Sequence, residues 1–243
     1  MSQIRTFLTG CTTMAAAIFA VATLTGAKDG PTHAQFDEIT VGRINIVEPN
    51  GTKRLIISNR AQFPGAFEQG KEIERPDRRS FAGMLFLDEE GNENGGFIQK
   101  GSRDANGKIN AGLSLTFDRY RQDQALQLKH TNSEKSSAAG VFINDVPFHE
   151  DAPLGSFDIY WKKANAIADE KERDAYWNSL IEQGKFSQNR VYLGTNGKRD
   201  SSLLLNDAKG RPRLRLAVSA AGQPVIEMLD EAGKAVKTIS LDK

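Results

Sequence analysis

The segment from residue 88 to residue 96 has the densest set of side chains able to do chemistry. It holds one aspartate, three glutamates and two asparagines within seven residues. Calcium prefers such oxygen ligands, so the candidate metal ligands are Asp88, Glu90, Asn92 and Glu93. Their spacing differs from that of an EF-hand loop, and acidic turns with glycine are also typical of hairpin tips. A calcium site and an ordinary hairpin tip both remain open.

Other motifs of catalysis or cofactor binding are incomplete. The three histidines, His33, His130 and His149, form no pair at helical metal-binding spacing, and no H-E-x-x-H motif is present. His149 precedes two acidic residues, which fits half of an acid–base site or a polar loop. The segment 194–198 lacks the complete phosphate-loop pattern, and there is no G-x-S-x-G elbow. We therefore predict no catalytic residue and no cofactor.

The segment 117–124 mixes aromatic, charged and amide side chains. Such a strand end can bind sugars through stacking and hydrogen bonds, or its charged groups can simply pair with neighbouring strands. A glycan-active enzyme would use carboxylates such as Asp88, Glu93, Asp118 or Asp123. Two carboxyl groups about 5–9 Å apart in one cleft would favour that alternative.

The composition limits the class of partner. Of the 243 residues, 39% are hydrophobic and 26% are charged, as in globular proteins, and the formal charge of +1 gives none of the basic excess of a nucleic-acid binder. The only cysteine is Cys11, in the apolar N-terminal segment. We therefore expect no disulfide, and stability that comes from the core.

The N-terminal segment predicts export. Residues 6–27 carry no charge, with Arg5 before them and Lys28 after them. Twenty-two residues are enough for an N-terminal apolar helix that serves as a transmembrane anchor, and the shorter apolar run 14–24 also fits a cleaved signal peptide. Both alternatives place the rest of the chain outside the cytoplasm, in the periplasm or cell envelope, and make residues 6–27 the part that contacts a membrane.

Beyond a polar linker at residues 28–37, β-branched and alternating segments are separated by turn sequences. These turns include Pro49-Asn50-Gly51 and the segments 88–91, 104–107, 206–210 and 230–233. Strands at such short intervals predict a mainly β, antiparallel domain, folded as a sandwich, a barrel or a meander.

One segment interrupts the strands. Residues 156–184 are rich in alanine, glutamate and lysine, and predict one helix or two short ones, with Ser156 or Asp158 at its start and Gly184 past its end. We expect Tyr176 or Trp177 to be exposed as an anchor for a partner. The predicted organisation is a leader (1–27), a linker (28–37), a β-rich domain (38–150), a helical segment (151–187) and a C-terminal meander (188–243).

Several segments resemble a family of uncharacterised bacterial exported or envelope proteins that are rich in β-structure. The resemblance rests on RINIVEPNG, DEEGNENGG and FDRYRQDQ, and covers about residues 38–150, with a looser match in GRPRLRLAV and DEAGKAV. It implies the fold and export, and it adds no catalytic residue.

These observations favour a non-enzymatic, extracytoplasmic binding or scaffolding domain, an accessory subunit of a membrane or envelope complex with a protein partner. The alternative is a carbohydrate-binding domain or a glycan-active enzyme. A flat surface rich in exposed apolar side chains would favour the first, and a cleft with paired carboxylates would favour the second.

Overall fold

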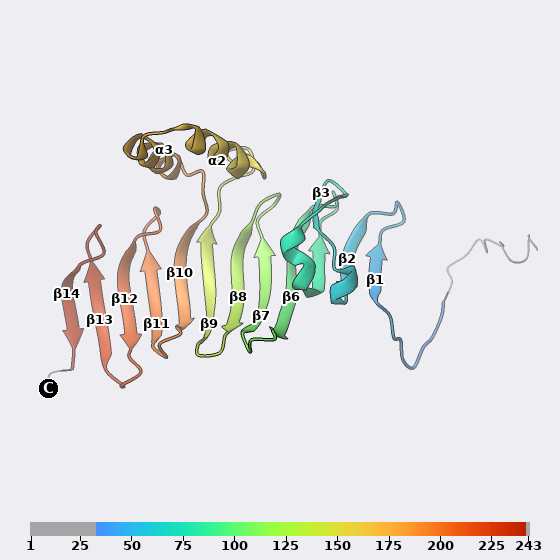
Figure 1. Ribbon diagram of the computed structural model, residues 1–243, viewed down its shortest axis with the longest axis horizontal. Helices are drawn as coiled ribbons and strands as arrows, with labels where there is room; N and C mark the ends of the chain where they lie inside the picture. Colours follow the sequence, from blue (N-terminus) through green and yellow to red (C-terminus); the bar gives the residue numbers. More distant parts are fainter. Residues whose placement is uncertain (1–32, 242–243) are drawn as a thin grey trace, which may run out of the picture. The chain divides into compact units, whose positions relative to one another are not determined.

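The computed structural model describes residues 33–241, and all of its helices and strands lie after Val41 (Figure 1). Residues 33–40 belong to a separate N-terminal unit and contain no helix or strand. The apolar segment 6–27 and the expected N-terminal helix lie outside the described residues. Within residues 33–241, no helix combines the length and the hydrophobicity needed to cross a membrane.

Twelve strands form one antiparallel sheet whose order follows the chain (Figure 1). They are β1 (Arg43–Val47), β2 (Lys53–Ser58), β5 (Ala82–Leu87), β6 (Glu93–Arg103), β7 (Ile109–Asp118), β8 (Gln124–Asn132), β9 (Ser137–Asp145), β10 (Gln188–Thr195), β11 (Ser201–Asn206), β12 (Pro212–Val218), β13 (Pro224–Leu229) and β14 (Ala235–Ser240). The predicted antiparallel, mainly β class is confirmed. The predicted sandwich or barrel is wrong for the described residues, because β1 and β14 each have one neighbour and end an open sheet. The third alternative, a meander, matches the strand order of this sheet.

Most of the tight hairpins use the same turn. In the turn between β5 and β6, the amide of Asp88 donates to the carbonyl of Asn92, and the amide of Gly91 donates to the carbonyl of Asp88. Oδ1 of Asp88 also accepts from the amides of Glu90 and Asn92. Gly91 has a φ of 76°, a conformation in which glycine avoids steric strain.

The same pattern of hydrogen bonds recurs at four other turns. The residues whose side chains accept the two amides there are Asp104, Asn196, Asp207 and Asp230. Because each turn is satisfied by its own five residues, a short sequence signal is enough to predict it.

An insertion between β2 and β5 builds the main core. It contains η1 (Arg60–Gln62), β3 (Ala66–Glu68), β4 (Lys71–Ile73) and η2 (Pro76–Ser80), and β3 and β4 form a separate two-stranded sheet. Phe67 of the insertion packs with Ile56 and Leu85 of the large sheet, and all three side chains are at most 3% exposed. The insertion therefore covers one face of the sheet at its N-terminal end.

A second insertion, between β9 and β10, holds α2 (Ser156–Ala166) and α3 (Glu170–Glu182) (Figure 1). Asp169 caps α3 by accepting from the amide of Glu172, and Gly184 lies just past its end with a φ of 66°. At the start of α2, Gly155 occupies the capping position predicted for Ser156 or Asp158. Because β9 pairs with β10, the strands before and after the helices belong to one sheet.

Candidate interaction surface

Side chains that face each other across the large sheet form two apolar rows on one face. Directly paired residues in antiparallel strands point to the same side, so the register between strands defines each row. The first row has one residue from each of the twelve strands, and all twelve are apolar. It consists of Ile44, Ile57, Met84, Phe97, Leu115, Leu128, Val141, Leu193, Leu203, Leu216, Ile226 and Ile239.

The second row lies on the same face, two residues away from the first row in each strand: later in the sequence in one strand and earlier in the next. It consists of Ile46, Leu55, Phe86, Gly95, Phe117, Leu126, Ile143, Val191, Leu205, Leu214, Met228 and Lys237. Lys237, on the outermost strand β14, is the only charged residue in either row. We call the face that carries these two rows the apolar face.

The apolar face is exposed. Among its large side chains, Phe117 is 50% exposed, Leu193 53% and Met228 45%. A soluble surface usually avoids contiguous apolar patches of this extent, and large ones mark binding sites. The described residues thus include a hydrophobic surface that spans the sheet and that no described residue covers.

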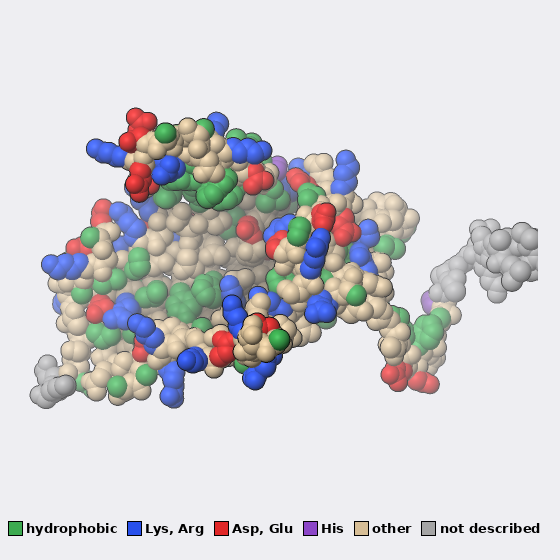
Figure 2. All heavy atoms as spheres, in the orientation of Figure 1, with side chains coloured by type: hydrophobic (Ala, Val, Ile, Leu, Met, Phe, Trp, Pro, Cys, Tyr) green, Lys and Arg blue, Asp and Glu red, His purple; other side chains and the backbone are tan. Residues whose placement is uncertain are grey.

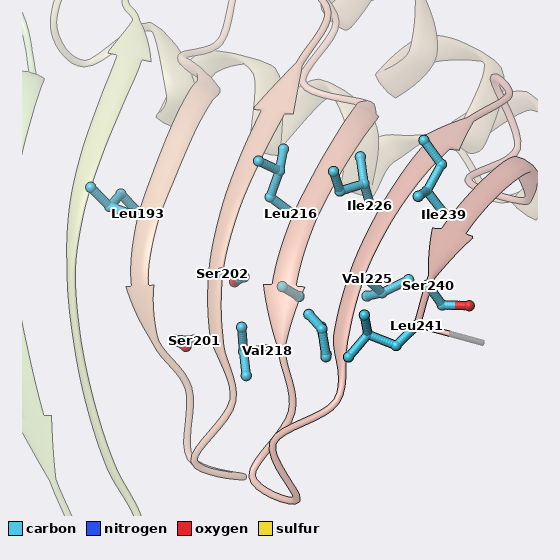
Figure 3. A pocket seen from close by; sticks show the side chains of 12 residues that line it. Leu193, Ser201, Ser202, Leu216, Val218, Val225, Ile226, Ile239, Ser240 and Leu241 are labelled. Atoms are coloured by element: carbon cyan, nitrogen blue, oxygen red, sulfur yellow. The ribbon is translucent and has the colours of Figure 1, made fainter. Parts of the chain in front are cut away.

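Two shallow hollows lie side by side on this face. One, of about 490 Å³, spans β10 to β14, where Leu193, Leu216, Ile226 and Ile239 lie in line across the strands (Figure 3). The other, of about 550 Å³, spans β6 to β10, and Leu193 lines both. Their linings are almost entirely apolar, so these hollows select for hydrophobic groups and offer few polar partners.

The opposite face is covered at one end and mixed in polarity over the rest. In the view of Figures 1 and 2 the first insertion lies in front of β5 and β6, over Leu85. Further along, this face presents Gln127 and Lys129 on β8, and an ion pair of 2.7 Å between Arg215 Nε and Glu227 Oε2. The same face also carries apolar side chains, among them Phe142 and Tyr192, whose ring centroids are 5.0 Å apart. It is therefore mixed in polarity, whereas the two rows of the apolar face contain a single charged residue.

The four side chains predicted as metal ligands lie around one turn, and each of them forms hydrogen bonds with other groups of the protein. Oε2 of Glu90 accepts from the hydroxyl of Tyr120 and from Arg121, and these bonds hold the pKa of Glu90 below its usual value. Asn92 is buried, and its Nδ2 donates to Asp88 and to Glu90.

The guanidinium of Arg78 donates two hydrogen bonds of 2.8 Å to Glu93, one to each carboxylate oxygen. Across residues 33–241, no three acidic, histidine or cysteine side chains are grouped as a metal site would require. The turn geometry accounts for these side chains without an ion, and calcium binding stays a prediction.

Asp118, a carboxylate of the alternative function, lies at the end of β7 and is half-buried. Oδ1 of its carboxyl is buried without a hydrogen-bond partner. Burial, and then the neighbouring charges of Glu93 and Asp123, raise the pKa of Asp118 to about 7, and Arg78 opposes this only in part. Such a carboxyl group retains its proton far above the usual range, a property shared by catalytic acids and by carboxyl groups that are simply buried.

The aromatic side chains of the helical insertion pack on one another. Trp177 lies within 6.2 Å, between ring centroids, of Phe157, Trp161, Tyr176 and Phe186. Tyr176 and Trp177 are half-buried in this cluster, whereas Trp161 is 52% exposed. The substantial exposure expected for Tyr176 or Trp177 is therefore found at Trp161, because α3 turns its aromatic side chains towards α2. Their role as partner anchors stays a prediction.

Sequence reasoning recognised many of the apolar segments and missed the surface that they form together. The usable signal was the repeated turn: each one fixes the register of its hairpin, and aligning the strands outward from the turns brings the apolar positions into line. Comparison of the chain with protein-family models gives no match, and comparison with curated protein sequences gives none either.

Proposed function

We propose that this chain is an exported, non-enzymatic binding or scaffolding protein whose working surface is the apolar face. It would be an accessory subunit of a membrane or envelope complex, held at the membrane by residues 6–27 or released from it after cleavage. The observation that carries the proposal is the pair of apolar rows. They cross all twelve strands and together contain one charged residue, Lys237.

Energetics support this proposal over a purely structural explanation. Burial of apolar surface is worth about 25 cal/mol per Å², so a partner that covers such a face gains a large favourable free energy. The flat, uncharged form of the face suits a broad partner surface. The resemblance of residues 38–150 to exported envelope proteins is consistent with this role.

The test is protection of the apolar face in the cell envelope. In the full chain with Cys11→Ala, a single cysteine is placed at Leu128 on the apolar face, or at Lys129, the next residue of β8, on the opposite face. Both native side chains are exposed. We expect a water-soluble maleimide to label Leu128→Cys several-fold more slowly than Lys129→Cys, with each rate normalised to that of the urea-unfolded chain. Equal normalised rates would contradict the proposal.

Export is tested separately with a reporter that is active only in the cytoplasm, fused after Lys243. We expect no reporter activity, because both explanations of residues 6–27 carry the C-terminus across the membrane. Strong activity would place the sheet in the cytoplasm and contradict export.

The second candidate, a glycan-active enzyme, has one observation in its favour: the raised pKa of Asp118 close to the charge of Glu93. General acids of glycosidases have such raised pKa values. Against it, both oxygens of Glu93 accept hydrogen bonds from Arg78, and this ion pair weakens the carboxylate as a nucleophile or base. Hydrolysis of a glycan that is abolished in Asp118→Asn would favour the enzyme.

A further inference from the structure

We infer that the apolar face is covered by the same face of a second copy of this chain, so that two open sheets pack into one sandwich. This inference rests on the proposed function and names the partner. Its first support is size. Strands lie about 4.8 Å apart and successive side chains of one face about 6.8 Å apart, so two rows across twelve strands cover about 750 Å² per copy.

That area matches the requirement of a stable dimer. Specific protein interfaces bury about 800 Å² on each partner. A partner for this face must also be as wide as a twelve-stranded sheet to cover both rows from β1 to β14. A second copy provides an apolar surface of that width, whereas a single helix or a short peptide would leave most of the face exposed.

The distribution of charge on the apolar face also supports a second copy as the partner. An interface between two identical faces must be free of charge near its centre, because every charge there would meet or approach its own copy. The only charged residue of the two rows, Lys237, lies on the edge strand β14, far from the middle of the sheet. Strongly acidic or basic partners would find no complementary charge within the rows.

The packing of sheets on one another also permits the arrangement. Two sheets pack face to face at a separation of about 10 Å, and the area of about 750 Å² is buried when the apolar rows of the two copies run nearly parallel. Six strands lie on each side of the boundary between β8 and β9. A two-fold axis near that boundary places each half of one sheet over the other copy, with Leu126, Leu128, Val141 and Ile143 at the centre.

The test uses the full chain in membranes, with Cys11→Ala and one introduced cysteine. A short bis-maleimide cross-linker should join two copies through Leu128→Cys or Ile143→Cys, because both positions lie near the centre of the interface. The matched control, Lys129→Cys, lies on the opposite face of the same strand and should give no homodimer.

A second measurement guards against misfolded variants. Two differently tagged copies are expressed together and purified through one tag. Leu128→Glu should weaken their association at least about tenfold, since an unpaired charge buried among apolar groups is costly, while Lys129→Glu should leave it unchanged. Far-ultraviolet circular dichroism of each variant establishes that the sheet is intact.

The outcomes separate this inference from the proposed function. Homodimers at Leu128 and Ile143, with loss of co-purification in Leu128→Glu, support the second copy. If the cysteine at Leu128 is protected from labelling but cross-links only to another protein, or to nothing because lipid covers it, the inference is overturned and the proposed function stands. If that cysteine is unprotected, both are overturned.

Discussion

Leu85 and Phe86 are neighbours on β5 and point to opposite faces of the sheet. Leu85 is 2% exposed beneath the first insertion, whereas Phe86 is 38% exposed on the apolar face. Both are large and apolar, and both lie in a strand with the same hydrogen-bonded neighbours, β2 and β6. The difference between them is the presence of a covering layer. Alternation along a strand fixes which face a side chain occupies, and other segments decide whether that face is buried.

The largest expected effect compares truncation of these two side chains. Leu85→Ala should lower the free energy of unfolding by about 2–5 kcal/mol, because it removes buried methyl groups and leaves a cavity. Phe86→Ala should cost about 1 kcal/mol in dilute protein, because the ring is already partly in water. Urea denaturation measures both.

Equal losses of unfolding free energy in Leu85→Ala and Phe86→Ala would contradict the difference between the two faces. A cost for Phe86→Ala that grows with protein concentration would sharpen it, since association stabilises the folded state by mass action and would bury the apolar face.

The next effect concerns Asp118, because burial of its carboxyl group makes ionisation of that group unfavourable. The pKa of Asp118 is raised to about 7 in the folded state, above its ordinary value of 3.8, so the folded protein binds more protons than the unfolded chain between these values. The contribution of Asp118 to stability should therefore be largest below about pH 4 and fall by roughly 2–4 kcal/mol as the pH rises to 7.

Asp118→Asn should flatten this pH dependence and raise stability at pH 8, because no charge then has to be buried. Asp174→Asn, at an exposed position in α3, is the control and should change the profile little. Thermal melts from pH 4 to pH 8 test both variants, and an unchanged profile in Asp118→Asn would contradict the assignment.

Two glycines with the same backbone conformation allow the two ends of the sheet to be compared. Gly91 lies at the end that the first insertion covers, and Gly233 lies in the turn between β13 and β14 at the other end. Gly91 and Gly233 both have a φ of 76°, so alanine meets the same strain of about 1 kcal/mol at either position. A Cβ atom at Gly91 would also lie 2.7 Å from the backbone of Gly70 in the insertion, whereas at Gly233 nothing lies within 4 Å.

Gly91→Ala should therefore lower the free energy of unfolding by about 1–3 kcal/mol more than Gly233→Ala, because the insertion must shift. Chemical denaturation of the two variants gives the difference directly. Similar costs would mean that the insertion does not press on this turn.

The smallest effect is spectroscopic and concerns the two tryptophans. Trp161 is 52% exposed and Trp177 is half-buried in the aromatic cluster. Acrylamide should quench the fluorescence of the Trp177→Phe variant, which retains Trp161, more strongly than that of Trp161→Phe. The reverse order would restore Trp177 as the exposed aromatic of the helices.

The turns and most of the strands of the large sheet could be predicted from the sequence because their causes are local. Asp88 and Gly91, for example, satisfy their own turn with a side chain and a backbone conformation. The strands β3 and β4 were missed because three residues are too few to show alternation. The division between α2 and α3 was left open, although Asp169 followed by Glu172 is a capping signal.

The interaction surface could not be predicted in the same way. Whether Phe97 and Leu115 are neighbours depends on the register between two strands, and whether they are exposed depends on what covers them. Neither is contained in the alternation of a single strand, which equally fits a sandwich, a barrel or an open sheet. The carboxyl of Asp118 was named as a candidate, but its raised pKa follows from burial that only the assembled structure provides.

The identity of strand order and chain order has a consequence for how the protein folds. Each new strand pairs with the strand before it in the sheet, and only the two insertions lengthen the connection between neighbours. The loops to be closed are therefore short and the contact order is low for an all-β protein, which favours rapid folding. As the polypeptide becomes available from its N-terminus, the sheet can lengthen one hairpin at a time, because no strand has to wait for a distant part of the chain.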